Sequence, residues 1–173
     1  MHMMAKMARL TVAGALLMTS VASAQATKAQ AAVASALKGG GGKHTALADG
    51  IEAASASGKP ISAMYEVEDG KLQLSVFVEK AGAFSEVFVD HMTGKVAKVD
   101  KITGGDDLKD AKNYSKASAK AKETIASALA KALTENPGYT AIDVTPVLAS
   151  GHAVAEITLM KDGKFKSVSE PLS

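Results

Sequence analysis

Apolar and polar residues alternate most regularly between Ile61 and Val96, which predicts antiparallel β-strands. Asp69-Gly70 and Ala81-Gly82 are two-residue turn candidates that divide this stretch into three strands. A shift of one residue would turn the apolar face to water, so the pattern also fixes the register. The expected partners across the two turns are Val67–Leu72, Tyr65–Leu74, Ala63–Val76, Ile61–Val78, Val76–Val87 and Leu74–Val89.

A short helix is expected before these strands and a further strand after them. Thr45 is a candidate N-cap for a helix whose apolar face is formed by Leu47, Ile51 and Ala54. After the third strand, Thr93-Gly94 turns the chain toward residues 96–102, expected as a fourth, edge strand.

The same order of elements recurs in the second part of the chain. Asp106 is expected to cap a helix-rich region, residues 107–135, and alternating strands follow around a turn at Asp162-Gly163. Helix residues repeat at a spacing of 78 and strand residues at 81, so three extra residues are expected, most simply in the loop Ala149-Ser150-Gly151.

These patterns predict an α+β protein made of two repeats, each with one helix packed on a three- or four-stranded antiparallel meander. Residues 25–38 are expected to be part of a flexible segment. The alternative is that they form a loose helix that docks elsewhere. The expected divisions are a signal peptide over 1–24, a flexible Ala/Gly-rich segment over 25–43, the first repeat over 44–102, a helical linker over 103–120 and the second repeat over 121–173.

The first 24 residues resemble a cleavable export signal. Lys6 and Arg9 precede an apolar run, residues 10–18, and Ala22-Ser23-Ala24 follows as a small-x-small cleavage pattern. The run is too short for a bilayer-spanning helix. We therefore expect cleavage after Ala24, a periplasmic or secreted location and no membrane span once the signal is removed.

The net charge bears on the class of partner, and the cysteine content bears on the source of stability. The chain has 20 basic and 18 acidic residues, and loss of Lys6 and Arg9 with the signal leaves 18 of each. A net charge near zero argues against nucleic acid as the partner. The sequence has no cysteine, so an exported form has no disulfides and depends on packing for stability.

The end of the first repeat resembles the PepSY domain. The resemblance rests on Tyr65-x-Val67, the turn Asp69-Gly70, and the run Val89-Asp90-x-x-Thr93-Gly94-Lys95-Val96. The second repeat is similar but more degenerate. The resemblance implies a non-catalytic exported module that inhibits or assists a peptidase.

The family turn motif also has a plain physical interpretation. Thr93-Gly94 forms a tight turn in which glycine tolerates positive φ, and Asp90 accepts hydrogen bonds from backbone N–H groups of that turn. Lys95 is expected to point to solvent. These residues are therefore interpreted as structural.

No pattern in the sequence indicates an enzyme. Nucleophile elbows and phosphate loops are missing, so we expect no catalytic, cofactor-binding or metal-ligating residues. His44, His91 and His152 lack metal-ligand spacing and are expected to be exposed without a role. The acidic residues around Asp106 are interpreted as a solvated helix start rather than a calcium loop.

One face of the predicted sheet offers a candidate partner surface. In the expected register, four large apolar side chains point away from the helix: Met64, Phe77, Phe84 and Phe88. The alternative is that the second repeat, or a helix within residues 107–135, covers this face and makes it ordinary core.

The sequence thus favours a protein-binding module whose partner is a secreted or periplasmic peptidase. Binding would use either an edge strand that pairs with the partner's backbone or the face around Phe77 and Phe88. The alternative from another class is a structural or ligand-sensing envelope module with no peptidase partner.

Overall fold

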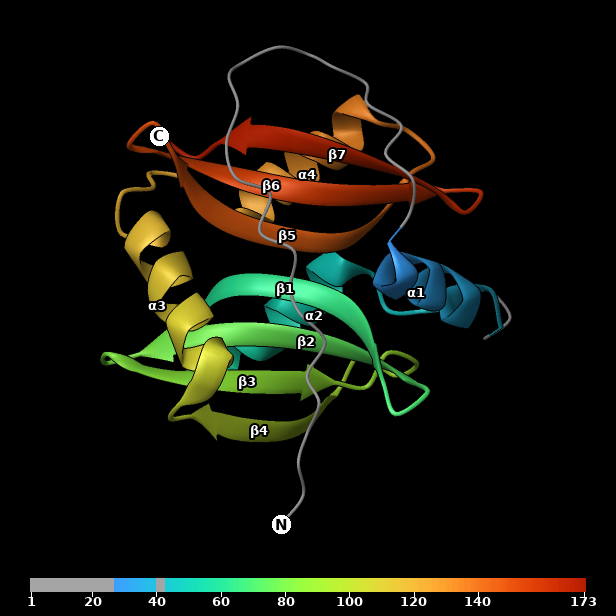
Figure 1. Cartoon of the computed structure of the whole chain (residues 1–173), viewed down its shortest axis with the longest axis horizontal. Helices are drawn as coiled ribbons and strands as arrows, with labels where there is room; N and C mark the ends of the chain where they lie inside the picture. The colour runs from blue at the N-terminus through green and yellow to red at the C-terminus, as the bar shows by residue number, and fades with distance from the viewer. Residues whose placement is uncertain (1–26, 40–42) are drawn as a thin grey trace.

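A single antiparallel sheet forms the centre of the molecule, with helices on both of its faces (Figure 1). The computed structural model describes residues 27–39 and 43–173. Seven strands follow the order β4-β3-β2-β1-β5-β6-β7. The protein is therefore α+β, as the pattern predicts. The expected signal peptide, residues 1–24, and its cleavage site lie outside the described residues.

The N-terminal strands form the predicted meander. They are β1 (Lys59–Glu68), β2 (Lys71–Lys80), β3 (Ala83–Val89) and the edge strand β4 (Val96–Ile102). The two turns have positive φ at both central residues, 49° and 75° at Asp69-Gly70 and 51° and 78° at Ala81-Gly82. Such turns match the twist of the strands that they join. Five of the six expected partner pairs are confirmed.

The sixth expected pair, Ile61 with Val78, is wrong because β1 contains a bulge. Val78 pairs with Pro60, and the register shifts between Pro60 and Ser62. The extra residue moves the Ile61 side chain to the opposite face of the sheet, where it packs with Phe77. Alternation alone does not predict the bulge, since Ile61 is apolar on either face.

The C-terminal strands repeat this geometry closely. They are β5 (Thr140–Ala149), β6 (His152–Lys161) and β7 (Lys164–Pro171). Their turns, Ser150-Gly151 and Asp162-Gly163, again have positive φ at both residues. β5 also contains a bulge, between Ala141 and Asp143. Its central residue, Ile142, follows Ile61 by the same spacing of 81 that separates the turns.

The three extra residues of the C-terminal half do not lie in the expected hairpin loop. The turn Ser150-Gly151 lies 81 residues after the turn Asp69-Gly70, and β5 likewise begins 81 residues after the start of β1. In the N-terminal half, α2 (Leu47–Ala54) and the 3-10 helix η1 (Ser55–Ser57) lead into β1 through Gly58 alone. In the C-terminal half, residues 136–139 separate α4 (Ile125–Glu135) from β5. The insertion therefore lies between helix and strand.

The two meanders join through β1 and β5. Ala63 pairs with Val144 and Met64 pairs with Asp143, in antiparallel orientation. Val144 follows Ala63 by the common spacing of 81, so corresponding positions of the two halves meet at the junction. Sequence periodicity does not predict this pairing, because it depends on contacts between distant segments.

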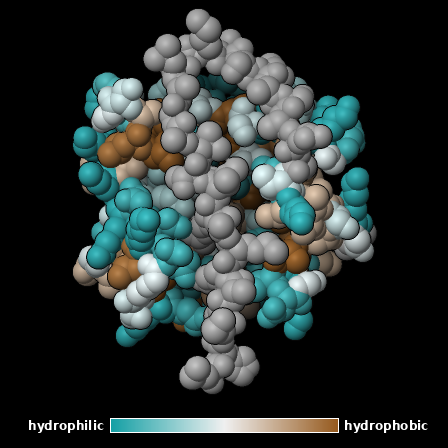
Figure 2. Space-filling model, in the orientation of Figure 1, coloured by the Kyte–Doolittle hydropathy of each residue, from teal (hydrophilic) through white to brown (hydrophobic). Residues whose placement is uncertain are grey.

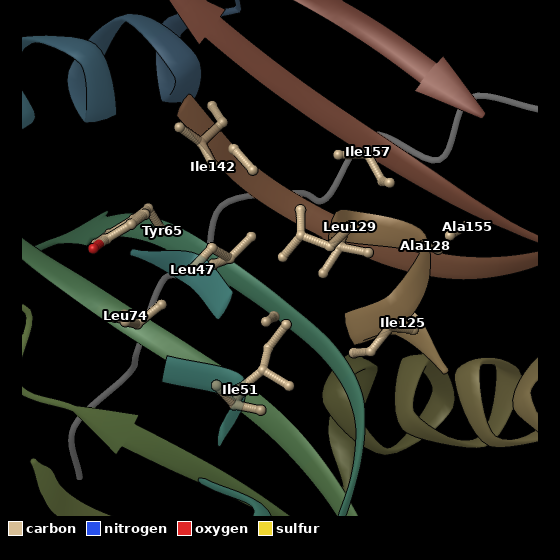
Figure 3. Packing of buried hydrophobic residues seen from close by; sticks show 14 of the residues in the cluster. Leu47, Ile51, Tyr65, Leu74, Ile125, Ala128, Leu129, Ile142, Ala155 and Ile157 are labelled. Carbon is tan, nitrogen blue, oxygen red and sulfur yellow. The ribbon is translucent and has the colours of Figure 1, made fainter. Parts of the chain in front are cut away.

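The larger core lies between the sheet and the helices α2 and α4, and it runs without a break across the β1–β5 junction (Figure 3). Residues from both halves contribute buried side chains, among them Leu47, Ile51, Leu74, Leu129 and Ile157. Each such side chain contributes about 1.5–3 kcal/mol by leaving water. The halves are therefore coupled by packing as well as by the shared sheet.

A smaller core lies on the other face, beneath α3 (Gly105–Ser118). This helix occupies part of the expected helix-rich region 107–135, which is divided into α3 and α4. Gly104, not Asp106, is the N-cap of α3, and no side chain caps it. Asp106 and Asp107 lie in its first turn, where negative charge favours the helix dipole.

The segment expected to be flexible contains a helix. Residues Lys28–Gly39 form α1, which buries Val33, Ala34 and Leu37 against β1 and β2. Alanine-rich sequence has high helix propensity, and tertiary burial stabilises the narrow apolar stripe. The prediction of a flexible segment was wrong for residues 28–39, where the alternative of a docked helix holds. The other additional helix, α3, lies within residues 103–120, which the sequence predicts as a helical linker.

Thr45 is not the N-cap of α2; Ala46 holds that position, without a side-chain cap. The backbone of Thr45 bonds elsewhere: its N–H donates to the His91 carbonyl over 2.7 Å, and its carbonyl accepts a hydrogen bond from the Tyr65 hydroxyl. This arrangement fixes the start of α2 against the β3–β4 turn and β1.

Candidate functional site

The four residues of the candidate partner surface do not form one exposed face. Phe77 is 1% exposed, and its ring centroid lies 6.2 Å from that of Tyr114 in α3. Phe84 packs against the same small core. Met64 and Phe88 remain half-buried. The alternative interpretation therefore holds for Phe77 and Phe84: a helix within 107–135 covers this part of the sheet.

Figure 2 shows one side of the molecule, where hydrophobic residues on the described surface lie in several separate areas among hydrophilic ones. Large contiguous apolar patches are what usually mark a preformed interface. The described surface shows no single large patch of this kind in that view.

The family turn motif has the geometry that the sequence predicts. Asp90 Oδ1 accepts hydrogen bonds from the backbone N–H groups of Met92, over 2.9 Å, and Thr93, over 2.8 Å. The hydrogen bonds from Thr93, and then that from Met92, hold the pKa of Asp90 below its usual value. Gly94 adopts φ of 70°, and Lys95 is exposed. The motif closes the connection between β3 and β4.

The strand that this turn introduces is the most open part of the sheet. β4 pairs with β3 on one side only, with Val99 opposite Val87 and Val96 opposite Val89. Val87 and Val89 belong to the larger core, but Val96 and Val99 are 41% and 47% exposed. Met92, in the preceding turn, is 55% exposed. An apolar strip therefore borders a free strand edge.

At the opposite edge of the sheet, the residues that follow β7 are held by packing and hydrogen bonds. After β7, the Leu172 side chain is buried in the larger core and its N–H donates to the Ala153 carbonyl over 2.9 Å. Its carbonyl accepts from the N–H groups of Lys122 and Glu123. Buried Glu170 bonds to Lys131 over 2.7 Å. The β7 edge thus has less apolar surface to offer than β4.

The β3–β4 turn also brings two histidines together, and the sequence pattern does not predict this contact. His44 and His91 are half-buried, with their Nδ1 atoms 3.0 Å apart. His44 Nε2 lies 2.8 Å from the Leu37 carbonyl oxygen. The prediction that these histidines are exposed was wrong for this pair, because both are half-buried. Their separation of 47 residues gives no spacing signal for the contact. His152 is exposed.

Two shallow pockets lie on either side of this turn. One is lined by Leu72, Phe88, Asp90 and His91 among others, and the second by Lys43, His44, Asp49 and Met92 among others. Within residues 27–39 and 43–173, no group of three or more His, Cys, Asp or Glu side chains is placed to hold a metal ion. The turn, β4 and the histidine pair therefore form the candidate functional region.

One carboxyl group elsewhere has a perturbed pKa. Burial raises the pKa of Glu156, which lies on β6 between Thr145 of β5 and Ser169 of β7. It faces no second carboxylate across either pairing, so these neighbours do not form the paired acids of a hydrolytic site.

No family model, curated protein or solved structure matches this chain. In the ranges that the structure describes, no helix is both long and apolar enough to cross a membrane.

Proposed function

We propose that this chain is a non-catalytic, exported protein-binding module that modulates or inhibits a peptidase, and that β4 with its apolar border is the binding site. The single observation that carries the binding site is the exposure of Val96 and Val99 on an edge strand. The peptidase as partner and the export rest on the PepSY resemblance and on the signal-like first 24 residues.

We further propose that the two halves are a duplicated PepSY-like unit. The common spacing of 81 for turns, strand starts and bulges supports a duplication. A β-bulge is seldom reproduced by chance at a corresponding position, since it is a specific departure from regular pairing.

Binding would proceed by addition of a partner strand to β4. The outer side of an edge strand presents backbone N–H and C=O groups that an extended segment can pair with. Val96, Val99 and Met92 would supply apolar contacts to alternate side chains of that segment. Lys98 and Lys101 are also exposed on β4, and Lys98 bonds to Asp100 over 2.5 Å. This charge favours a segment with acidic residues and disfavours pairing of β4 with another β4.

The test is titration of a thermolysin-type metallopeptidase with the purified protein, with residual activity as the readout. We expect activity to fall with protein concentration, and Val99→Asp to weaken this effect at least about tenfold because a central apolar contact is lost. Ser167→Asp is the matched control, since it adds the same charge to an exposed position of the other edge strand, β7, opposite the uncharged Thr158.

Two outcomes would contradict the proposal. Equal loss of inhibition in both variants would mean that β4 is not the site. Absence of any effect at about micromolar excess, with the protein folded by circular dichroism, would remove the peptidase as partner and favour the structural or ligand-sensing alternative.

A further inference from the structure

The histidine pair joins three segments that are distant along the chain. His44 belongs to the segment before α2, His91 to the β3–β4 turn, and Leu37, whose carbonyl His44 contacts, to α1. The backbones of the two histidine segments are also linked, since the Thr45 N–H donates to the His91 carbonyl. The two rings are therefore held in place by more than their own contact.

The hydrogen bonds assign the tautomers of the neutral pair. A carbonyl oxygen only accepts, so His44 must donate its Nε2–H to Leu37, and its Nδ1 then carries a lone pair. The proton between the two Nδ1 atoms must come from His91. Movement of that proton to His91 Nε2, the other neutral tautomer, leaves two lone pairs facing each other.

We propose that His44 Nδ1 and His91 Nδ1 bind a divalent transition-metal ion of the zinc class. Imidazole nitrogens bind zinc at about 2.0–2.1 Å, so two of them on one tetrahedral ion lie about 3.3–3.4 Å apart. The observed separation is 3.0 Å, so binding requires the two nitrogens to move apart by a few tenths of an ångström and both rings to turn toward the ion. His44 already has the hydrogen bond from its other ring nitrogen to a carbonyl that orients metal-binding histidines.

The surroundings define what kind of metal site this is. No third His, Cys, Asp or Glu of the described residues joins the pair, so water must complete the coordination. Asp49 lines the pocket beside His44, and Asp90 interacts electrostatically with His91. Lys43 lines the same pocket and opposes a cation. The site is thus open and exchangeable, unlike a closed structural zinc site.

Calorimetric titration of the full chain with zinc chloride at about pH 7.5, where free imidazole is neutral, tests this proposal. We expect saturable binding that His44→Gln and His91→Gln each weaken at least about tenfold, because each removes a ligand. His152→Gln is the matched control and should bind as the wild type does. Zinc should raise the melting temperature of the wild type and of His152→Gln only.

Binding should weaken in acidic solution, because a protonated imidazole is not a metal ligand. Glutamine retains an amide that can bond to the remaining ring, and circular dichroism of each variant checks that it folds. Undiminished binding in both His44→Gln and His91→Gln would overturn the proposal. So would the absence of saturable binding to folded wild type at about millimolar zinc, which would leave a pair that only shares a proton.

Discussion

The outer face of the sheet, on which α3 packs, differs between the two halves at corresponding positions. In the N-terminal half, Phe77 is 1% exposed beneath α3 and packs with Ile61 and Ile102. The corresponding residue of β6, at the spacing of 81, is Thr158, which is half-buried. Ile102 comes from β4, and within the described residues β7 is an edge strand with no neighbour in the position that β4 takes beside β3. A fourth strand therefore allows a second core, and the half without it keeps a more polar outer face.

The largest expected effect on stability comes from removing the Phe77 ring, which has no aromatic counterpart in the C-terminal half. Phe77→Ala should lower the free energy of unfolding by about 3–5 kcal/mol, because a fully buried aromatic side chain leaves a cavity. Thr158→Ala, the corresponding change in β6, should cost about 1 kcal/mol or less. Chemical denaturation followed by circular dichroism measures both. Equal effects would show that the outer core is not specific to the N-terminal half.

A smaller effect on the free energy of unfolding should distinguish α2 from α4, the two helices that pack on the larger core. Gly50 in α2 corresponds to Ala128 in α4 at the helix spacing of 78. A Cβ atom at Gly50 would lie 2.5 Å from Leu74 Cδ2, so α2 packs too closely on β2 for alanine. Gly50→Ala should therefore cost about 1–3 kcal/mol despite its better helix propensity.

The matched change in the other half should act through helix propensity and through the loss of one buried methyl group, because Ala128 is buried in the larger core. Ala128→Gly should cost about 1–2 kcal/mol. The measurement for both variants is the shift in denaturation midpoint at constant slope. A stabilised Gly50→Ala would show that Leu74 moves aside and that the close approach of α2 is not required.

The smallest expected effect depends on pH and concerns the polar outer face of the C-terminal half. Burial raises the pKa of Glu156, so the native state holds its proton more strongly than the unfolded state does. Stability should therefore fall as pH rises from the unfolded pKa, about 4.3, through the raised native value. Glu156→Gln should raise stability at pH 7 by about 0.5 kcal/mol or less.

This gain should disappear below about pH 4, where the carboxyl group is protonated in both states. Thermal unfolding at both pH values measures the difference. The corresponding residue of β2 is Ser75, which is buried and donates to Glu86 over 2.5 Å. A pH-independent gain in Glu156→Gln would mean that the burial of the charge is not the cause.

The local sequence pattern predicts the strand pairing within each meander but not the pairing that joins the two meanders. Alternation and turn residues determined the strand pairs from Val67–Leu72 to Leu74–Val89 and the edge strand β4, since both signals act between neighbours in sequence. The bulge at Ile61 was missed because an isoleucine is compatible with either face. The β1–β5 junction depends on distant contacts and leaves no periodic signal.

The candidate site was predicted only in part. The Asp90 turn was correctly derived, because an Asx closure is a local hydrogen-bond pattern. For Phe77 and Phe84 the alternative prediction holds, since a helix within residues 107–135 covers this part of the phenylalanine face. The contact of His44 with His91 was beyond a single sequence, since only the fold brings these segments together.

The junction of β1 with β5 has a consequence for assembly. Ala63 pairs with Val144 and Met64 pairs with Asp143, so one edge of each meander is occupied by the other meander. Further strands can then be added only at the outer edge strands, β4 and β7, and exposed lysines on an edge strand such as β4 disfavour its pairing with a second copy of itself.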